Sequence, residues 1–507
     1  MKTTIDKIYI EKTGLFLGLF LFFYIIIFQP IENITTNNMA ACSLLMAIWW
    51  MTEALPLAAT SLVPMILFPL LGILSAKETA DQFINSTIFL FLGGFLLALA
   101  VEQWDLHKRI SLNIIKLLGK SPARMIFGFM VSSWLMSMLI TNTATTIMML
   151  PIGLAVIREM ESEFGTKKTK TLSTALLLGI AYAATVGGIA TLVGTVPNMV
   201  FVRIFENTFP LAPDISFGKW FMFGFPLSAA SLAILYFIIV KFLFKPDKGI
   251  KINRNLISNQ LKELGKMAYE EKAVLIIMAS TAFLWIFRKD ISLGSFTIPG
   301  WSSALPFGHL IDDATVAISA SIALFLIPVK NKSSAQKRLL NHGIFKRVPW
   351  DIVLIFGGGF ALAEGFQSSG LSVLIGEQFS SLSGIHPIIF TFLICFLIIF
   401  LSEVTSNTAT TNTFLPILAS MAVAIGINPM LLMVPATIAA SYAFMLPVAT
   451  PPNAIIFSSE KVKISEMIKA GFVLNIIAVV VITTMFYLFG QFIYGIDIGV
   501  MPGWATP

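Results

Sequence analysis

Long apolar runs with almost no charge decide what this chain can fold into. Gly14–Phe28 contains no charged residue, and comparable runs recur along the chain. Hydrophobic residues make up 56% of the sequence and charged residues 12%, about half the charged share of a typical soluble domain. Such a chain cannot cover itself with polar surface in water. The sequence therefore predicts one polytopic membrane protein rather than several soluble domains.

The composition also excludes several classes of function. The net charge of +7 is too dispersed for a nucleic-acid footprint, so no nucleic-acid partner is expected. Cys42 and Cys395 give neither a disulfide framework nor a metal motif. No Walker motif is present, so ATP is not expected to drive the process. An intramembrane enzyme would need a His, acid or Cys cluster, and the sequence offers none; we expect no enzyme and no organic cofactor.

The distribution of Lys and Arg predicts how the chain crosses the membrane. The first apolar run has no cleavage site after it, which indicates a retained helix with a cytoplasmic N-terminus. Lys and Arg concentrate in four segments expected in the cytoplasm: 105–124, 158–170, 241–272 and 330–347. They are absent from four segments expected outside: 29–38, 376–387, 425–430 and 494–507. An external C-terminus follows, with an odd number of crossings, about 11.

Three polar motifs occur twice. The heptapeptide 140–146 (ITNTATT) recurs as 405–411 (TSNTATT), which places Asn142 and Asn407 265 residues apart. Gly94 and Gly359, in matching Gly-Gly motifs, have the same spacing. The segments 194–198 (GTVPN) and 449–453 (ATPPN) lie 255 residues apart. Three pairs in one order at nearly one spacing indicate an internal duplication.

The two copies have opposite flanks. The first Asn-Thr motif lies between Lys/Arg-rich segments, and the second lies between segments without Lys or Arg. One copy is therefore expected to enter from the cytoplasm and the other from outside, as in the inverted-topology repeats of secondary transporters. A duplication without surviving function is the alternative. Polar motifs at membrane depth argue against it.

The first Asn-Thr motif lies in a stretch of unusual length. Residues 125–157 are apolar-rich, and one crossing needs about 20 residues whereas two need about 40. A re-entrant hairpin with Thr141–Thr146 at its tip fits this length, and the repeat favours a hairpin over two short crossings at 388–425. The predicted fold is an all-α polytopic membrane protein with about 11 transmembrane helices plus two re-entrant hairpins in an inverted-topology repeat.

The second motif of each copy contains proline inside an apolar helix, expected over roughly 172–205 and 430–458. Proline lacks an N–H and frees a carbonyl one turn earlier, and Na⁺ can bind such a carbonyl. A plain kink is the alternative for any single proline.

Acids near the ends of apolar segments are expected to cap helices or face an interface and not to form the site: Glu53, Glu102, Glu364 and Glu403.

At these motifs the chain resembles the divalent anion/sodium symporter (DASS, INDY-type) family over nearly its whole length. The strongest likeness lies in 444–453 (FMLPVATPPN) and 403–409 (EVTSNTA), with weaker likeness at 50–54 and 89–94. The resemblance implies Na⁺-coupled import of C4 dicarboxylates such as succinate, fumarate and malate. It also implies an elevator-type mechanism and a homodimer. Some members of the family exchange dicarboxylates without Na⁺, and others carry citrate or sulfate.

The resemblance also implies binding residues. Substrate contacts would come from the two Asn-Thr tips and the two proline motifs: Thr141, Asn142, Thr143, Thr195, Ser406, Asn407, Thr408, Thr450 and Pro451. The first Na⁺ site would use Ser137, Thr141, Asn142 and Gly194, and the second Ser402, Thr405, Asn407 and Ala449. Two residues depart from the family pattern. Thr141 replaces a serine, and Val196 replaces the first proline of a Pro-Pro-Asn motif, which puts substrate choice or the first Na⁺ site in question.

The repeat and the resemblance together divide the chain into four regions. Scaffold helices are expected over 1–85 and 246–349, the latter including a cytoplasmic linker. Transport regions, each with one hairpin, are expected over 86–245 and 350–507.

Two functions other than Na⁺-coupled import are alternatives: a Na⁺-independent exchanger and an anion channel. A channel would lack saturable uptake that depends steeply on Na⁺.

Overall fold

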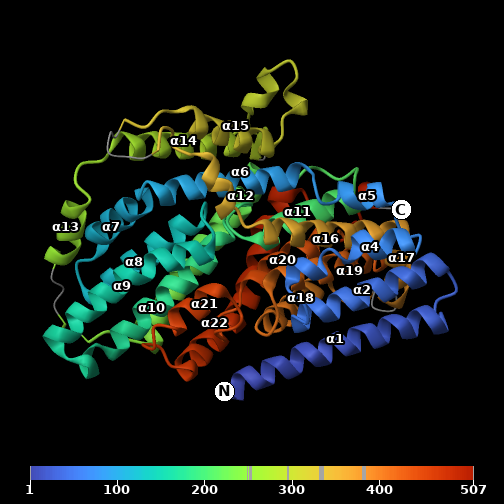
Figure 1. Cartoon of the computed structure of the whole chain (residues 1–507), viewed down its shortest axis with the longest axis horizontal. Coiled ribbons are helices and arrows are strands. Elements are labelled where there is room, and N and C mark those ends of the chain that lie inside the picture. The colour runs from blue at the N-terminus through green and yellow to red at the C-terminus, as the bar shows by residue number, and fades with distance from the viewer. Residues whose placement is uncertain are drawn as a thin grey trace.

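The chain is described by a computed structural model that covers residues 2–247, 249–250, 254–293, 296–330, 336–379 and 384–505 (Figure 1). Helices form most of it. The first half contains α1 Lys2–Phe28, α2 Ile34–Thr52, α3 Leu57–Thr60, α4 Val63–Leu70, α5 Ala76–Asp81, α6 Ser86–Gln103, α7 Leu106–Leu118, α8 Pro122–Ser137, α9 Asn142–Phe164, α10 Thr166–Gly188, α11 Val196–Thr208, α12 Phe217–Tyr236 and the π-helix η1 Phe237–Leu243.

The second half contains a similar series of helices. These are α13 Arg254–Glu263, α14 Tyr269–Ile286, α15 Asp313–Leu326, α16 Trp350–Ser368, α17 Leu371–Phe379, α18 Pro387–Ser402, α19 Asn407–Ala424, α20 Met430–Ser441, α21 Pro451–Phe457, α22 Ile464–Met485, the π-helix η6 Phe486–Gly490 and α23 Gln491–Tyr494. Short 3-10 turns occur at Trp301–Ala304, Gly308–Leu310, His342–Arg347 and Gly503–Ala505. A small departure from the predicted all-α fold is an antiparallel hairpin, β1 Ile291–Leu293 with β2 Phe296–Ile298, in which Ile291 pairs with Ile298.

The duplication extends from the motifs to whole elements. The series α6 to α12 ends in a π-helix, and so does the series α16 to α22. Pro122 begins α8 and Pro387 begins α18, with the same spacing of 265 residues that separates the Asn-Thr motifs. The two halves therefore use the same order of helices and breaks.

Each Asn-Thr motif lies where two helices meet in a hairpin. α8 packs against α9, and the chain turns at 138–141; α18 and α19 meet in the same way across 403–406. The predicted tip at Thr141–Thr146 is wrong in extent, because Thr141 already caps α9: its Oγ1 accepts a hydrogen bond from the N–H of Ala144 at 3.3 Å. Thr143 therefore lies in the first helical turn rather than in the turn of the hairpin.

Both predicted proline-containing helices are broken, but the prolines do not cause the break in the expected way. α10 ends at Gly188 and α11 begins at Val196, while α20 ends at Ser441 and α21 begins at Pro451. The prolines occupy the first turn of the second helix, where an N–H would have no helical partner anyway. The unwound segments 189–195 and 442–450, rather than a proline kink, free the backbone carbonyls.

Each half packs one short helix against the helices of the other half. α11 packs against α19 and α20 of the second half, and α21 packs against α9 and α10 of the first half. Such reciprocal packing is what a two-fold relation between the halves produces. The main hydrophobic core covers most of both halves, and a smaller one joins α1, α2 and α4 to α16.

Figure 1 shows α13 and the turn between α9 and α10 towards one end, and α5, α17 and the C-terminus towards the other. Within the described residues, six helices are long and apolar enough to cross a membrane, or seven if α16 and α17, bent by 77°, form one span. Shorter apolar helices, such as α18 and α20, are parts of hairpins or broken elements. The count of about 11 crossings stays a prediction.

The inverted repeat predicts that the two hairpins are reached from opposite sides. Lys116 and Lys167 flank the first hairpin and are exposed; Ser383 lies outside the described residues, so His386, exposed before α18, marks the second. We expect Lys116→Cys and Lys167→Cys to react with an impermeant maleimide only from the cytoplasmic side, and His386→Cys only from outside. Both native cysteines are buried, which keeps the background low. Labelling of residues 116 and 386 from the same side would refute the inverted topology.

Candidate functional site

Four helices begin at the predicted substrate residues. The N-cap residues are Thr141 of α9, Thr195 of α11, Ser406 of α19 and Thr450 of α21. The first N–H groups of a helix have no partner within it, and the helix dipole makes this end partly positive. The site is thus built from the ends of helices, which can attract anions without any Lys or Arg.

Four oxygen atoms of the first half pack closely around Gly188 and Gly194. A Cβ atom on Gly188 would collide with Asn142 Oδ1 and lie 3.0 Å from the carbonyl oxygen of Gly194. A Cβ atom on Gly194 would collide with the carbonyl oxygen of Gly188 and lie 2.9 Å from that of Ser137. Ser137 Oγ also donates a hydrogen bond to Asn142 Oδ1 at 2.5 Å. Only glycine leaves room at positions 188 and 194 for these oxygens to converge.

Asn198 holds the unwound segment of the first half in place. Its Nδ2 donates to the carbonyl oxygen of Thr191 at 2.7 Å and to that of Gly188 at 3.4 Å. Thr191 Oγ1 in turn donates to the carbonyl oxygen of Met138 in the hairpin tip and accepts from the N–H of Gly194 at 3.1 Å. These bonds fix the unwound segment to the tip.

The second half repeats this arrangement around Asn453. Asn453 Nδ2 donates to the carbonyl oxygens of Ala443 and Leu446, both at 3.0 Å. These acceptors precede Asn453 by ten and seven residues, as Gly188 and Thr191 precede Asn198. The contacts of the two asparagines are therefore equivalent.

The second hairpin tip contains buried oxygens that the protein does not satisfy. Within the described residues, Ser402 Oγ and Asn407 Oδ1 are buried and have no hydrogen-bond partner. A buried polar atom without a partner is costly, and a bound cation or water can supply that partner. The other hydroxyl of the predicted second Na⁺ site is already engaged: Thr405 Oγ1 donates to the Leu401 carbonyl oxygen at 2.8 Å and lies 2.7 Å from Thr410 Oγ1.

The structure thus brings together Ser137, Asn142 and Gly194 of the predicted first Na⁺ site, whereas Thr141 serves as a helix cap. In the described part of the chain no side-chain hydrogen bond joins Ala449 to the second tip, although Phe444, Met445 and Leu446 of its segment do bond to it. Sequence reasoning missed Gly188 as a site residue and did not recognise Asn198 and Asn453 as anchors. The sequence does single out both asparagines, because each is the last residue of the third duplicated motif.

The predicted substrate residues differ in exposure. Thr143 and Thr408, in the first turns of α9 and α19, are half-buried, and Pro451 at the start of α21 is exposed. Val448 is 81% exposed, whereas Ala449 and Thr450, which follow it, are buried. The segment before α21 is therefore packed at its end and exposed at Val448.

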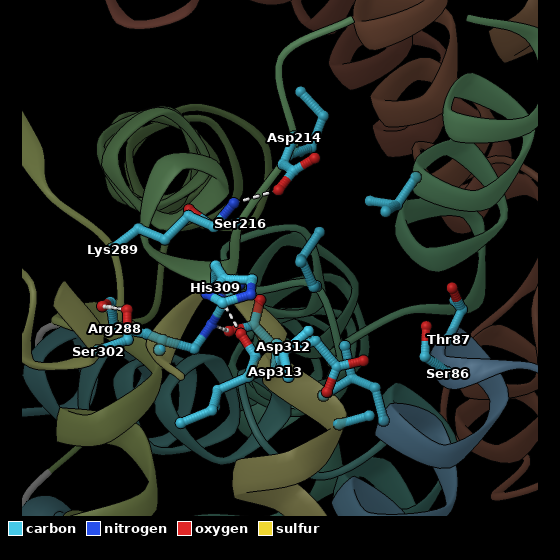
Figure 2. A pocket seen from close by; sticks show the side chains of 18 of the residues that line it. Ser86, Thr87, Asp214, Ser216, Arg288, Lys289, Ser302, His309, Asp312 and Asp313 are labelled. Carbon is cyan, nitrogen blue, oxygen red and sulfur yellow. Dashed lines mark hydrogen bonds and ion pairs between the residues drawn. The ribbon is translucent and has the colours of Figure 1, made fainter. Parts of the chain in front are cut away.

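A cavity of about 850 Å³ lies on another side of the first cluster. Leu192 of the unwound segment and Met199 of α11 form part of its wall, which continues along the start of α6 and the connection between α14 and α15. Figure 2 shows its ion pairs: Arg288 bonds to Asp313 at 2.5 Å, and Lys289 pairs with Asp214. Both cations are neutralised, so the cavity wall keeps an excess of carboxylates.

The chain matches the family model described as the sodium:sulfate symporter transmembrane region over residues 12–496. It is 43% identical over 496 residues to the sodium-dependent dicarboxylate transporter SdcS of Staphylococcus saprophyticus, covering 96% of this chain and 93% of that protein. The SdcS protein of Staphylococcus aureus strain MRSA252 is 42% identical over 495 residues, with the same coverage.

Two solved structures share the fold at low identity. The MtrF transporter of Neisseria gonorrhoeae aligns with a TM-score of 0.53 and 12% identity, covering 82% of this chain and 83% of that one. The YdaH transporter of Alcanivorax borkumensis aligns with a TM-score of 0.53 and 13% identity, covering 89% and 98%. Likeness at this identity shows a shared helical fold, in agreement with the helical fold that the sequence predicts. The family match over nearly the whole chain is decisive: this chain belongs to the sodium:sulfate symporter family and is a multi-pass membrane transporter, not an enzyme.

Proposed function

We propose that the protein imports C4 dicarboxylates such as succinate, fumarate and malate together with Na⁺. The observation that carries this proposal is the pair of clusters in which carbonyl and amide oxygens meet the N-termini of broken helices. Broken helices of secondary transporters use these two features for cations and anionic groups respectively. The names of the SdcS relatives support the same pair of ligands.

The first Na⁺ site would consist of the carbonyl oxygens of Ser137, Gly188 and Gly194 with Asn142 Oδ1. Hard oxygen donors of this kind suit a small desolvated cation, and the close approach of four oxygens is costly without one. Thr141 stays in the proposal as the cap that orients Asn142. The site therefore differs from the sequence prediction by the addition of Gly188.

The second Na⁺ site would use Ser402, Asn407, Thr405 and Ala449. The buried, unpartnered oxygens of Ser402 and Asn407 support the presence of a cation there. The segment that contains Ala449 is held against the tip by hydrogen bonds from its preceding residues. The backbone carbonyl of Ala449 would complete the site from that segment.

The substrate would bind between the two tips. Its two carboxylates would take N–H groups and polar side chains of the two tips: Thr141, Asn142 and Thr143; Ser406, Asn407 and Thr408. Thr195, Thr450 and Pro451, at the starts of α11 and α21, would line the pocket. None of these residues is cationic, so the bound Na⁺ ions supply the missing positive charge. Binding of Na⁺ would thus create the anion site, which gives a physical reason for coupling.

Transport would proceed by an elevator-type movement in a homodimer in the plasma membrane. Two ion pairs support a single moving body: Lys461 bonds to Glu161 at 2.7 Å, and Lys170 bonds to Glu466 at 3.3 Å. They tie α9 to the segment between α21 and α22, and α10 to the first turn of α22, across the two halves. The separate core around α1, α2 and α4 supports a distinct scaffold.

The main competing functions are Na⁺-independent exchange of dicarboxylates and transport of citrate or sulfate. Purified protein in liposomes would separate them. Uptake of labelled succinate is measured with and without an imposed Na⁺ gradient, and with and without internal succinate. We expect uptake that requires external Na⁺ and does not require internal succinate. Uptake that requires internal succinate and ignores Na⁺ would establish the exchanger instead.

Removal of either tip asparagine should abolish coupled uptake. Asn142 and Asn407 each offer a carbonyl oxygen to a cation and an NH₂ to a carboxylate, so one truncation removes both contacts. At ~1–3 kcal/mol per lost polar contact, Asn142→Ala or Asn407→Ala should lower succinate uptake about a hundredfold. The control is Thr143→Ser, which keeps its hydroxyl. Unchanged Na⁺-dependent succinate binding in a folded Asn407→Ala protein would show that the motif is only structural.

A methyl group at Gly188 should fill the first cation site. The added Cβ would collide with Asn142 Oδ1, so Gly188→Ala should weaken Na⁺ activation of uptake by roughly tenfold or more. Gly499→Ala is a matched control, because no atom lies within 4 Å of its added Cβ. The Na⁺ concentration for half-maximal uptake is measured for both variants. Equal values would place the first site elsewhere.

The two-ended site should discriminate by charge at both ends of the substrate. A monocarboxylate can satisfy only one tip and leaves the other bound cation without a counter-charge. We expect succinate uptake to exceed lactate uptake at least ~100-fold at equal concentration, since one charge-assisted contact is worth ~1.5–3 kcal/mol and two tips take part. Competition by unlabelled acids against labelled succinate measures this. Equal inhibition by lactate and succinate would contradict a two-ended pocket.

A further inference from the structure

Glu403 is a carboxylate buried in the tip of the second hairpin, with 3% of the residue exposed. Its Oε1 accepts hydrogen bonds from the N–H groups of Phe444 and Met445 at 2.7 and 2.9 Å, and from Asn475 Nδ2 at 2.7 Å. Its Oε2 accepts from the N–H of Leu446 at 3.0 Å. Four N–H donors therefore surround one carboxylate, an arrangement that stabilises its ionised form.

The donors are neutral, so an ionised Glu403 keeps its full negative charge. Three of them are N–H groups of the unwound segment, which has no helical partners to offer them. Among the residues that the structure describes, no ion pair includes Glu403. Burial of an unneutralised charge is costly unless it serves another charged group.

The first half makes the same junction without any charge. Met138 occupies the position equivalent to Glu403, 265 residues earlier, and Thr191 occupies the position equivalent to Leu446, 255 residues earlier. There the Thr191 hydroxyl bonds to the Met138 carbonyl oxygen and joins the unwound segment to the tip. A neutral junction is therefore sufficient to hold this geometry, and the carboxylate of the second half needs another explanation.

The neighbouring residues supply that explanation. Glu403 directly follows Ser402 and begins the hairpin turn that leads to Asn407, and Ser402 and Asn407 carry buried oxygens without partners. We propose that Glu403 positions the second cation site and provides its negative charge, so that the two Na⁺ sites of the transporter are unequal. The identity of the ion rests on the proposed function; the asymmetry between the tips rests on the structure alone.

Three variants of the full-length purified protein test this. Glu403→Gln removes the charge at constant size. The double variant Glu403→Met with Leu446→Thr copies the neutral junction of the first half. Asn475→Ala removes one neutral donor and keeps the charge. The measurement is the Na⁺-dependent rise in melting temperature, which reports binding without requiring transport. Titration with NaCl at constant ionic strength, balanced with choline chloride, gives the Na⁺ midpoint.

We expect both neutral variants to raise the Na⁺ midpoint about tenfold or more, as the loss of one charge–charge interaction in a partly desolvated site predicts. Asn475→Ala should stay within about threefold of wild type. If Glu403→Gln does not fold, the double variant tests the proposal by itself, because it joins the tip to the unwound segment as the first half does. A wild-type midpoint in either folded neutral variant would overturn the proposal.

The outcomes for the wild type separate this inference from the proposed function. Stabilisation by Na⁺ together with failure to take up succinate would refute the dicarboxylate function and leave the role of Glu403 to be decided by the variants. Absence of any Na⁺-dependent stabilisation of wild type would overturn both.

Discussion

The fold depends on how two stretches of unwound backbone are satisfied inside an apolar interior. Each break leaves N–H and C=O groups without helical partners, at a cost of ~1–3 kcal/mol for every group left unpaired. Asn198 and Asn453 meet this requirement from the first turn of the following helix, each by donating to two carbonyl oxygens behind it. Because these carbonyls are fixed, the remaining oxygens of each segment can point at a ligand.

The two halves share this geometry and differ in chemistry. The first tip is joined to its unwound segment by the Thr191 hydroxyl, and the second by the Glu403 carboxylate. In the first half Ser137 and Asn142 satisfy each other, whereas Ser402 and Asn407 do not. The duplication therefore preserved the positions of the helix ends while the polar groups between them diverged. Two sites of different strength would let cations bind in a preferred order.

The duplicated motifs were sufficient to predict the hairpins, the broken helices and three members of the first cluster. Their spacing carries this information because equivalent polar residues at membrane depth must be placed on equivalent backbone. The extent of the breaks was not predictable from the prolines, since Pro197, Pro451 and Pro452 begin helices rather than interrupt them. Gly188 was not recognised, and Glu403 was expected only to cap a helix or face an interface. Their partners lie far along the sequence: Asn142 for Gly188, and residues 444–446 and 475 for Glu403.

The packing of α11 and α21 against the opposite halves has a consequence for folding during synthesis. α9 and α10 leave the ribosome early, but α21, which packs against both, follows only after most of the second half has been translated. At ~10 residues per second the first hairpin waits roughly half a minute for its partner helix. During that time its polar tip lacks its final neighbours in the bilayer. Either half synthesised alone would therefore stay unfinished, and membrane insertion must tolerate an incomplete first half until the last helices arrive.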